Sequence, residues 1–284
     1  MESANPLHAF VELPDMSSDQ FDQFAKLIHE LAGIHLKEHK LTLLSNRIRK
    51  RLRSLNMQSY DDYYRLLQND DRGEMVHFLE VVTTNESYFW RTTQNFEALK
   101  IHALPEVLKL YRNEEIKIWS AGCSTGEEPY NLTIELIESM RKVGFFNFRI
   151  IATDISTRVV QFAKEGRYSG RKIEKIPPDI MKRYFAPLPN DPEVFEVRED
   201  LKKKIEFRVE NLFQSTPKSM HIIFCRNVMI YFKREEQEIL VNRFYDTLKP
   251  GGYLFIGHAE SLQMLKTDFK TISTPLGILY RREV

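Results

Sequence analysis

WSAGCSTGEEPY, residues 119–130, is the stretch of this 284-residue chain that decides its fold. The apolar run that leads into it, with Ile116 and Trp119, predicts a buried strand. Small residues at 122–126 then predict a tight turn, whose backbone can approach a ligand closely, and a helix that begins near Glu127. A strand, a small-residue turn and a helix in this order are typical of a ligand site at the carboxyl end of a strand in an α/β sheet.

Two carboxylates at the start of the predicted helix, Glu127 and Glu128, restrict the ligand of this turn. They would repel a phosphate, and the stretch lacks both the lysine of a P-loop and the glycine spacing of a dinucleotide-binding turn. A ligand with positive charge and hydroxyl groups fits better, and S-adenosylmethionine carries a sulfonium, an ammonium group and a ribose. The alternative is that the acidic pair only favours the helix N-terminus, and for Glu127 the two interpretations stay even.

ATDIS, residues 152–156, ends the second predicted strand with Asp154. In doubly wound folds an acidic side chain at this place binds the ribose hydroxyls of a nucleoside cofactor. The alternative is that Asp154 caps a helix that begins near Ser156. Turn and acid together predict a nucleoside cofactor, and the absence of pyrophosphate-type glycines favours S-adenosylmethionine over NAD.

The pattern of the chain changes along its length. Residues 1–16 show no periodicity, and residues 17–80 show apolar side chains at helical spacing with no strand pattern. From about residue 115, short apolar runs alternate with helical segments, which predicts an α/β domain with a mostly parallel sheet. The segment from about 170 to 204 is too long for a simple crossover and predicts an inserted helix with a small antiparallel β element. Residues 269–283 predict an antiparallel hairpin at the sheet edge.

The composition is that of an ordinary globular chain and indicates no partner. Lys plus Arg number 41 and Asp plus Glu 40, and no apolar run reaches the roughly 18 residues of a membrane span. The N-terminus lacks the pattern of a secretory signal. The two cysteines, Cys123 and Cys225, have no metal-ligand spacing, and we expect both to be small buried hydrophobes. These features predict a cytoplasmic protein that needs no metal.

Several motifs occur together in the order and spacing of one protein family. They are TTNESYFWR (83–91), SAGCSTGEEPY, ATDIS, VENLF, IFCRNVMIYF and LKPGGYLFIGHAES. With them the chain resembles, from about residue 20 to 281, the CheR family of chemotaxis receptor methyltransferases. STGEEPY and FCRNVMIYF are specific motifs, whereas LKPGG is shared by many methyltransferases.

The resemblance implies an α/β fold, a Rossmann-like S-adenosylmethionine-dependent methyltransferase with an N-terminal all-helical domain. After a flexible tail at 1–16, the helical domain would span 17–80 and a linker at 81–92 would close over the cofactor. The methyltransferase domain would span 93–284, with a small antiparallel β-subdomain inserted at about 170–204.

The activity implied is protein-glutamate O-methylation in the signal transduction of chemotaxis. Family members transfer a methyl group from S-adenosylmethionine to glutamates on the cytoplasmic helices of chemoreceptors, which gives methyl esters and S-adenosylhomocysteine. An exposed glutamate has a pKa near 4.3 and is already ionised at neutral pH, so no general base is required. The enzyme has to hold the carboxylate oxygen in line with the methyl group.

The resemblance also assigns roles to residues at matching positions. Those that would contact the cofactor are Asn85, Ser87, Arg91, Glu128, Asp154, Asn211, Leu212, Arg226 and Asn227. Glu128 would bind the amino end of the cofactor and Asp154 its ribose. Arg91 and Tyr231 would be the catalytic residues, with Tyr231 facing the acceptor carboxylate. The sequence leaves open that Tyr231 is a core residue and that Arg226 is only a structural ion-pair partner.

A predicted helix over residues 40–53 is strongly basic. Its cationic side chains are Lys40, Arg47, Arg49, Lys50, Arg51 and Arg53. This face is either solvated surface or an electrostatic dock for the acidic helical bundle of a methyl-accepting receptor. Two other functions stay open: a nucleic-acid methyltransferase that docks through this helix, although the chain lacks the [DN]PP[YF] motif, and a non-catalytic cofactor-binding scaffold.

The insertion also bears on how a receptor is held. Some family members grip a C-terminal receptor pentapeptide with a glycine-containing loop in the β-subdomain. Here the corresponding loop, APLPNDPEV at 186–194, has three prolines and no glycine. We therefore expect no binding of the pentapeptide.

Overall fold

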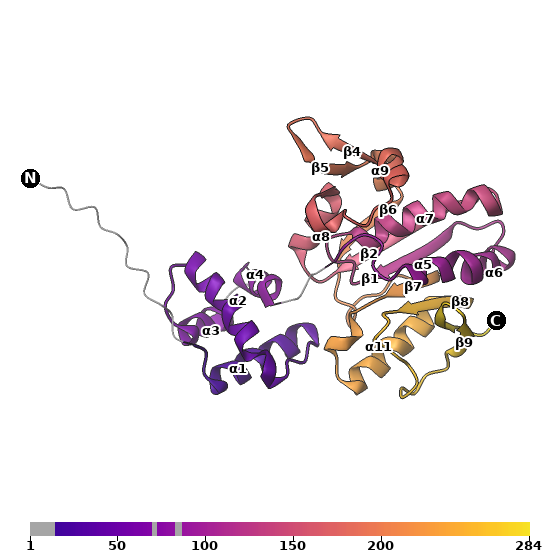
Figure 1. Cartoon of the computed structure of the whole chain (residues 1–284). Helices are drawn as coiled ribbons and strands as arrows, with labels where there is room; N and C mark the ends of the chain where they lie inside the picture. Colours follow the sequence, from indigo (N-terminus) through magenta and orange to yellow (C-terminus); the bar gives the residue numbers. More distant parts are fainter. Residues whose placement is uncertain (1–14, 70–72, 83–86) are drawn as a thin grey trace, which may run out of the picture. The chain divides into compact units, whose positions relative to one another are not determined.

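Two units make up the chain, Met1–Thr83 and Thr84–Val284, and each is described by itself. The computed structural model describes residues 15–69, 73–82 and 87–284 (Figure 1). Within these ranges the first unit is all helical, and the second holds every strand. This agrees with the predicted order of a helical region followed by an α/β region.

The first unit consists of short amphipathic helices. They are α1 Ser18–Ala32, the 3-10 turn η1 Glu38–Lys40, α2 Leu41–Ser54, α3 Tyr60–Asn69 and α4 Gly73–Val82. α1 begins at a capping box, in which the Ser17 side chain accepts the Gln20 N–H and the Gln20 side chain accepts the Ser17 N–H. It ends at Gly33, whose positive φ of 72° suits glycine.

The core of this unit is aromatic, and an ion pair lies at its margin. Phe24, Tyr63 and Phe78 are fully buried and contact one another at ring-centroid distances of 5.8–6.2 Å. At its margin Arg51 pairs with Glu74 over 2.5 Å, and the Tyr63 hydroxyl donates to the same carboxylate over 2.7 Å. Arg51 of the basic helix is therefore used inside the unit.

The second unit alternates strands with helices. Its strands are β1 Ile116–Ala121, β2 Phe148–Asp154, β3 Arg167–Tyr168, β4 Phe185–Leu188, β5 Asp191–Val197, β6 Ile205–Val209, β7 Met220–Cys225, β8 Leu248–Ile256, β9 Lys270–Thr274 and β10 Gly277–Arg281. Its helices are α5 Thr93–Ala98, α6 Leu104–Leu110, α7 Glu127–Val143, α8 Thr157–Glu165, α9 Pro178–Tyr184, α10 Glu199–Lys202 and α11 Arg234–Thr247. Single turns are η2 Leu99–Ala103, η3 Gly170–Lys172 and η4 Met229–Tyr231.

The main sheet has seven strands in the order β6-β2-β1-β7-β8-β10-β9. The pairs from β6 to β8 are parallel, and β10 is antiparallel to both β8 and β9. The predicted parallel sheet and antiparallel edge hairpin are thus confirmed. Because β1, β2, β7 and β8 run the same way, the loops after their carboxyl ends meet at one edge of the sheet.

Helices cover both faces of this sheet. On one face, α5, α6 and α7 pack over a core in which Phe224 stacks on Phe255 with ring centroids 4.4 Å apart. On the other face, α11 packs its Phe244 against Trp119 of β1 at 5.3 Å. β1 is buried from both sides, which fixes the turn that follows it.

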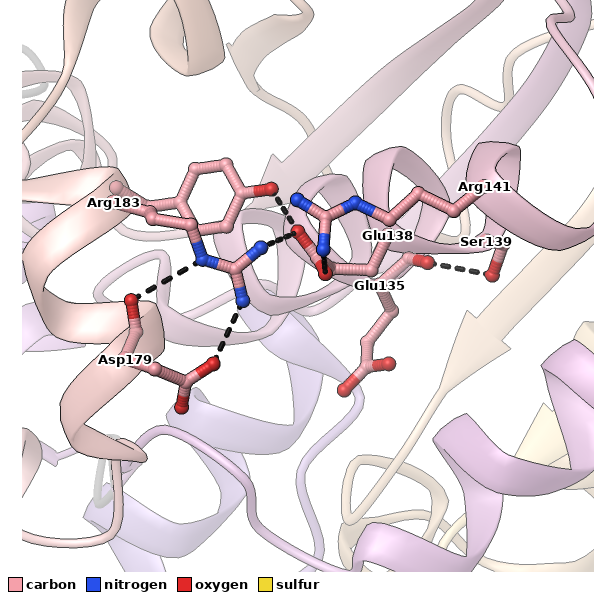
Figure 2. Close-up of polar contacts among 7 residues, drawn as sticks. Glu135, Glu138, Ser139, Arg141, Asp179 and Arg183 are labelled. Carbon is pink, nitrogen blue, oxygen red and sulfur yellow. Dashed lines mark hydrogen bonds and ion pairs between the residues drawn. The ribbon is translucent and has the colours of Figure 1, made fainter.

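A small antiparallel sheet, β3-β5-β4, is inserted between α8 and β6. Its helix α9 is tied to α7 by a polar cluster around Glu138, which accepts from Arg183 over 2.6 Å and from the Tyr184 hydroxyl (Figure 2). Arg183 also pairs with Asp179 over 2.8 Å, and Arg141 with Glu138 over 3.3 Å. The insertion is therefore anchored to the helix that begins at the glycine turn.

Candidate active site

The glycine turn between β1 and α7 has little freedom. Gly122 and Gly126 have φ of +79° and +92°, values that favour glycine, and Ser124 also has a positive φ of 50°. The Gly122 and Cys123 N–H groups donate to the Thr153 carbonyl over 2.8 and 2.9 Å. A Cβ on Gly122 would lie 2.5 Å from Cγ2 of Val228, so the turn also packs against the loop after β7.

Glu127 takes part in a buried charge pair. Its side chain is 0% exposed, forms an ion pair with Lys172 of η3 and accepts from the Thr125 hydroxyl over 2.8 Å. Lys172 also donates to the Thr125 hydroxyl over 2.7 Å. Of the two interpretations left open for Glu127, its surroundings favour a structural role, because its side chain is fully buried and forms an ion pair with Lys172.

Glu128 lies on the other side of the helix start. Its Oε1 accepts from the Ser120 hydroxyl over 2.7 Å, and its Oε2 accepts from Nη1 of Arg226 over 3.1 Å. The Arg226 side chain is 3% exposed, and burial lowers the pKa of its guanidinium against the opposing effect of Glu128. Arg226 also donates to the Arg91 carbonyl and lies over the Phe96 ring at 5.2 Å. It is therefore an ion-pair partner and, at the same time, a side chain at the carboxyl edge of the sheet.

Asp154, at the end of β2, supports the turn directly. Its Oδ2 accepts from the Ser124 N–H over 2.8 Å and its Oδ1 from the Ser156 N–H over 3.1 Å. Burial raises the pKa of this carboxyl, although the backbone N–H groups oppose the shift. The N-cap of α8 is Ser156, whose hydroxyl accepts from Val159, so the alternative that Asp154 is the cap is wrong.

Residues 87–92 cross the same edge of the sheet and are held at several points. The Phe89 N–H donates to the Lys172 carbonyl over 3.0 Å, and the Trp90 N–H donates to Oδ1 of Asn131 over 2.7 Å. Trp90 has a positive φ of 57°, a conformation that persists only where surrounding contacts impose it. Arg91 follows, with its guanidinium carbon 6.0 Å from the Tyr88 ring centroid.

Other predicted site residues follow β6 and β7. The Glu210 N–H donates to the Asp154 carbonyl over 2.9 Å, which places Asn211 and the buried Leu212 beside the end of β2. Tyr231 is half-buried in η4, in the loop after β7.

Ser87 is half-buried, and its carbonyl accepts from Lys172 over 3.4 Å. Asn85 lies outside the residues that the structure describes. The contacts therefore bring Glu128, Arg226 and the Arg91 backbone together, with Asp154 across the glycine turn.

Sequence reasoning missed one residue of this edge, Glu260. Its carboxylate accepts N–H groups from Asn227, Val228, Ile230 and Gly257 over 2.6–3.3 Å. His258, in the same GHAES stretch, is exposed. The sequence pattern could not predict this role, because most of the backbone N–H groups that Glu260 binds lie about 30 residues away in the chain.

Neither cysteine has the surroundings of a nucleophile. Cys123 and Cys225 are both buried, and burial raises the pKa of each thiol well above its usual value. Across residues 15–69, 73–82 and 87–284, no group of His, Cys, Asp or Glu side chains could hold a metal ion. Over the same ranges no helix has both the length and the apolarity needed to cross a membrane.

Two family models match the chain, one in each unit. The family model described as "CheR methyltransferase, all-alpha domain" matches residues 19–83, and "CheR methyltransferase, SAM binding domain" matches residues 85–278. The second match includes each candidate site residue named above, from Asn85 to Glu260.

Curated relatives are similar over most of their length. Chemotaxis protein methyltransferase 1 of Pseudomonas aeruginosa is 33% identical over 268 residues, which cover 92% of this chain and 97% of the relative. The chemotaxis protein methyltransferase of Salmonella typhimurium is 35% identical over 259 residues, with 89% and 88% covered. That of Borreliella burgdorferi is 34% identical over 258 residues, with 88% and 90% covered.

Proposed function

The chain belongs to the CheR methyltransferase family, and from that premise we propose that it methylates glutamate side chains on the cytoplasmic helices of chemotaxis receptors. It is an S-adenosylmethionine-dependent methyltransferase of chemotaxis, with S-adenosylmethionine as its cofactor. The glutamate acceptor and the receptor are the proposal. The observation that carries it is a carboxylate-lined glycine turn beside a buried arginine, an arrangement that suits a cationic cofactor and an ionised acceptor.

The residues at the turn fit this cofactor by their charges. Glu128 is a partly exposed carboxylate that suits the ammonium group, and Asp154 offers acceptor oxygens to the ribose hydroxyls. The Arg226 guanidinium, paired with Glu128 at this edge, would add a positive charge near the cofactor carboxylate. Asn211 and Leu212 would flank the adenine.

Further cofactor contacts would come from both loops at the edge of the sheet. Asn85 and Ser87, in the segment before α5, would close over the cofactor. Asn227, beside Arg226 after β7, would complete the pocket. The ties of residues 87–91 to η3, α7 and Arg226 support this role, because they hold the segment at the carboxyl edge.

The reaction requires positioning rather than proton transfer. S-adenosylmethionine supplies a methyl group bound to a cationic sulfur, and the acceptor carboxylate is already ionised. Arg91 would orient that carboxylate by charge, and the Tyr231 hydroxyl would donate one hydrogen bond to it. Alignment of the two reacting atoms lowers the activation barrier by roughly several kcal/mol, because their translational and rotational entropy is already lost on binding.

We propose that the receptor binds at helix α2, through fewer cations than the sequence suggests. Arg47 donates to the Val82 carbonyl over 2.5 Å, and Arg49 and Arg51 pair with Asp15 and Glu74. The cations left exposed are Lys50 and Arg53 on α2 and Lys40 just before it. These side chains would meet acidic residues on the receptor helices.

The inserted sheet would not bind a receptor pentapeptide. The turn between β4 and β5 contains Pro189 and no glycine, and the register of the pair shifts at Pro187 and Leu188. Calorimetric titration with such a pentapeptide checks this, and micromolar affinity would contradict it.

The function is tested by transfer of tritiated methyl from S-adenosylmethionine to a purified chemoreceptor cytoplasmic fragment, followed by mild alkali. The expected label is released as volatile methanol, as from a carboxyl methyl ester. Tyr231→Phe should lower turnover with little change in cofactor affinity, whereas Asp154→Ala should weaken cofactor binding about tenfold. Alkali-stable label, or label only when nucleic acid replaces the receptor, would contradict the proposed acceptor.

A further inference from the structure

The loop that follows β7 carries three of the proposed site residues, Arg226, Asn227 and Tyr231. It leaves the strand at Cys225 and reverses at once, since Asn227 has a positive φ of 61°, and it ends in the single turn η4. A reversal of this kind points several backbone N–H groups to one side, where they need acceptors.

Glu260 supplies those acceptors. Its Oε2 accepts from Asn227 N over 2.9 Å and from Gly257 N over 2.6 Å. Its Oε1 accepts from Val228 N over 3.1 Å and from Ile230 N over 3.3 Å. One carboxylate thus binds three amides of the loop and one at the end of β8, and a charged acceptor makes each bond stronger than a neutral one would.

The backbone at Gly257 packs closely against this carboxylate. A Cβ on Gly257 would lie 2.6 Å from Oε2 of Glu260 and 2.9 Å from both the backbone nitrogen and Nδ2 of Asn227. Gly257, Asn227 and the Glu260 carboxylate are therefore closely packed, and no side chain larger than that of glycine fits at position 257 without a shift.

We propose that Glu260 is a positioning residue for methyl transfer, which fixes the loop at 226–231 so that Tyr231 meets the acceptor carboxylate. The role given to Tyr231 rests on the proposed function. Glu260 itself acts through the backbone of the loop and touches neither reactant.

The contacts of the loop predict a specific kinetic signature. Arg226 has fixed points of its own, the Glu128 carboxylate and the Arg91 carbonyl. The N–H groups of Asn227, Val228 and Ile230 donate to Glu260 instead. Loss of the Glu260 carboxylate should therefore impair turnover more than cofactor binding.

The test compares Glu260→Gln and Glu260→Asp with a matched control, Glu138→Gln. Glutamine has the same shape but presents an amide donor to N–H groups, whereas aspartate keeps the charge on a shorter side chain. Glu138 also accepts several hydrogen bonds, but it holds α9 to α7 and has no contact with the loop. Each variant is measured for turnover on a receptor fragment, S-adenosylhomocysteine affinity by calorimetry, and hydrogen exchange of the peptide covering 226–231.

For Glu260→Gln we expect at least a tenfold loss of turnover, a change in S-adenosylhomocysteine affinity of threefold or less, and at least tenfold faster exchange at 226–231. Glu260→Asp should fall between it and the wild type, and Glu138→Gln should retain wild-type turnover and exchange. Turnover within twofold of wild type in Glu260→Gln, or cofactor affinity lost in proportion to turnover, would overturn the assignment. If Glu260→Gln does not fold, Glu260→Asp takes its place. Turnover within twofold of wild type, or cofactor affinity lost in proportion to turnover, then overturns the assignment.

The outcomes also separate this inference from the proposed function. A wild-type protein that methylates no receptor fragment contradicts the acceptor and leaves the exchange measurement to decide whether Glu260 fixes the loop. Unchanged exchange in Glu260→Gln contradicts the inference whatever the acceptor is.

Discussion

Arg226 after β7 and Glu128 at the start of α7 form an ion pair in which the arginine is buried and its Nη1 donates to Oε2 of the partly exposed Glu128 over 3.1 Å. The pair joins the loops that follow two neighbouring strands, β1 and β7. Burial disfavours the charge of Arg226, and Glu128 is the carboxylate that compensates for it. One interaction thus contributes both to the fold of the edge and to the proposed cofactor site.

Glu128→Gln should therefore weaken folding and cofactor binding together. Removing one partner of a buried pair leaves an uncompensated charge, and we expect a loss of about 3 kcal/mol in the free energy of unfolding. S-adenosylhomocysteine affinity should fall about tenfold or more. Urea unfolding and calorimetry measure the two effects. Glu97→Gln is the control, because Glu97 is 48% exposed in its pair with Lys100 and should cost under about 1 kcal/mol. Equal losses in the two variants would contradict the prediction.

Local patterns predicted the framework of this protein because they depend on neighbours in the chain. The strand, turn and helix at 119–130 and the edge hairpin at 269–283 needed only burial pattern and small residues. The partner of Glu127 could not be predicted in this way, since Lys172 is 45 residues away in an insertion.

The basic helix illustrates the same limit. Sequence reasoning counted Arg49 and Arg51 among the cations available to a partner. In the structure they pair with Asp15 and Glu74, which lie 34 and 23 residues away. Charge pairing across tertiary contacts leaves no periodic signal, so a cluster of cations in a sequence overstates what a partner can reach.

Gly122→Ala should disturb the site, whereas Gly144→Ala should not. Both glycines have positive φ, 79° and 84°, and Gly144 also has a ψ of 173°, so alanine strains the backbone at each position by about 1–3 kcal/mol. Only at Gly122 does the new Cβ meet another residue, Val228 at 2.5 Å, whose overpacking adds about 1–3 kcal/mol. Urea unfolding and S-adenosylhomocysteine binding check this. The prediction is contradicted if Gly144→Ala weakens cofactor binding, or if Gly122→Ala leaves it unchanged. Either result would show that the contact with Val228 is unimportant.

Glu127 and Lys172 should show strong coupling in a double-mutant cycle. Glu127 is 0% exposed, so Lys172→Met leaves its charge buried with the Thr125 hydroxyl as its donor, and we expect a loss of about 3–5 kcal/mol. Adding Glu127→Gln to Lys172→Met should restore part of the lost stability, and we expect a coupling energy of about 1–3 kcal/mol between the two positions. Unfolding of the two single variants and the double variant gives the value. Simple additivity would mean that the pair does not support the turn.

Reversing two exposed charges on α2 should affect the acceptor and leave the cofactor unchanged. Lys50→Glu with Arg53→Glu should raise the KM for a receptor fragment several-fold, and the effect should shrink at high salt because exposed charges are screened. Arg51→Ala serves as the contrast: its pair with Glu74 is partly buried, so it should lower stability instead. KM at two salt concentrations and thermal unfolding distinguish the two. A double reversal that leaves KM unchanged would remove α2 from the docking surface.

His221 should make the stability of the second unit depend on pH. Its ring on β7 is 1% exposed, and Nδ1 accepts from the Lys117 N–H over 2.9 Å, which requires the neutral form. Burial, with a further contribution from Lys249, lowers its pKa from 6.5 to about 4. Between these values the unfolded chain binds more protons than the folded one, so this contribution is complete above pH 6.5 and is lost as the pH falls toward 4.

By pH 5 the wild type should lose about 2 kcal/mol more than His221→Gln does, relative to pH 7.5. His258→Gln is the matched control, because it removes an exposed histidine of the same unit. Free energies of unfolding from urea titrations at pH 7.5, 6 and 5 give the three slopes. Parallel slopes for wild type and His221→Gln would mean that the His221 ring gains or loses its proton equally in the folded and unfolded chain.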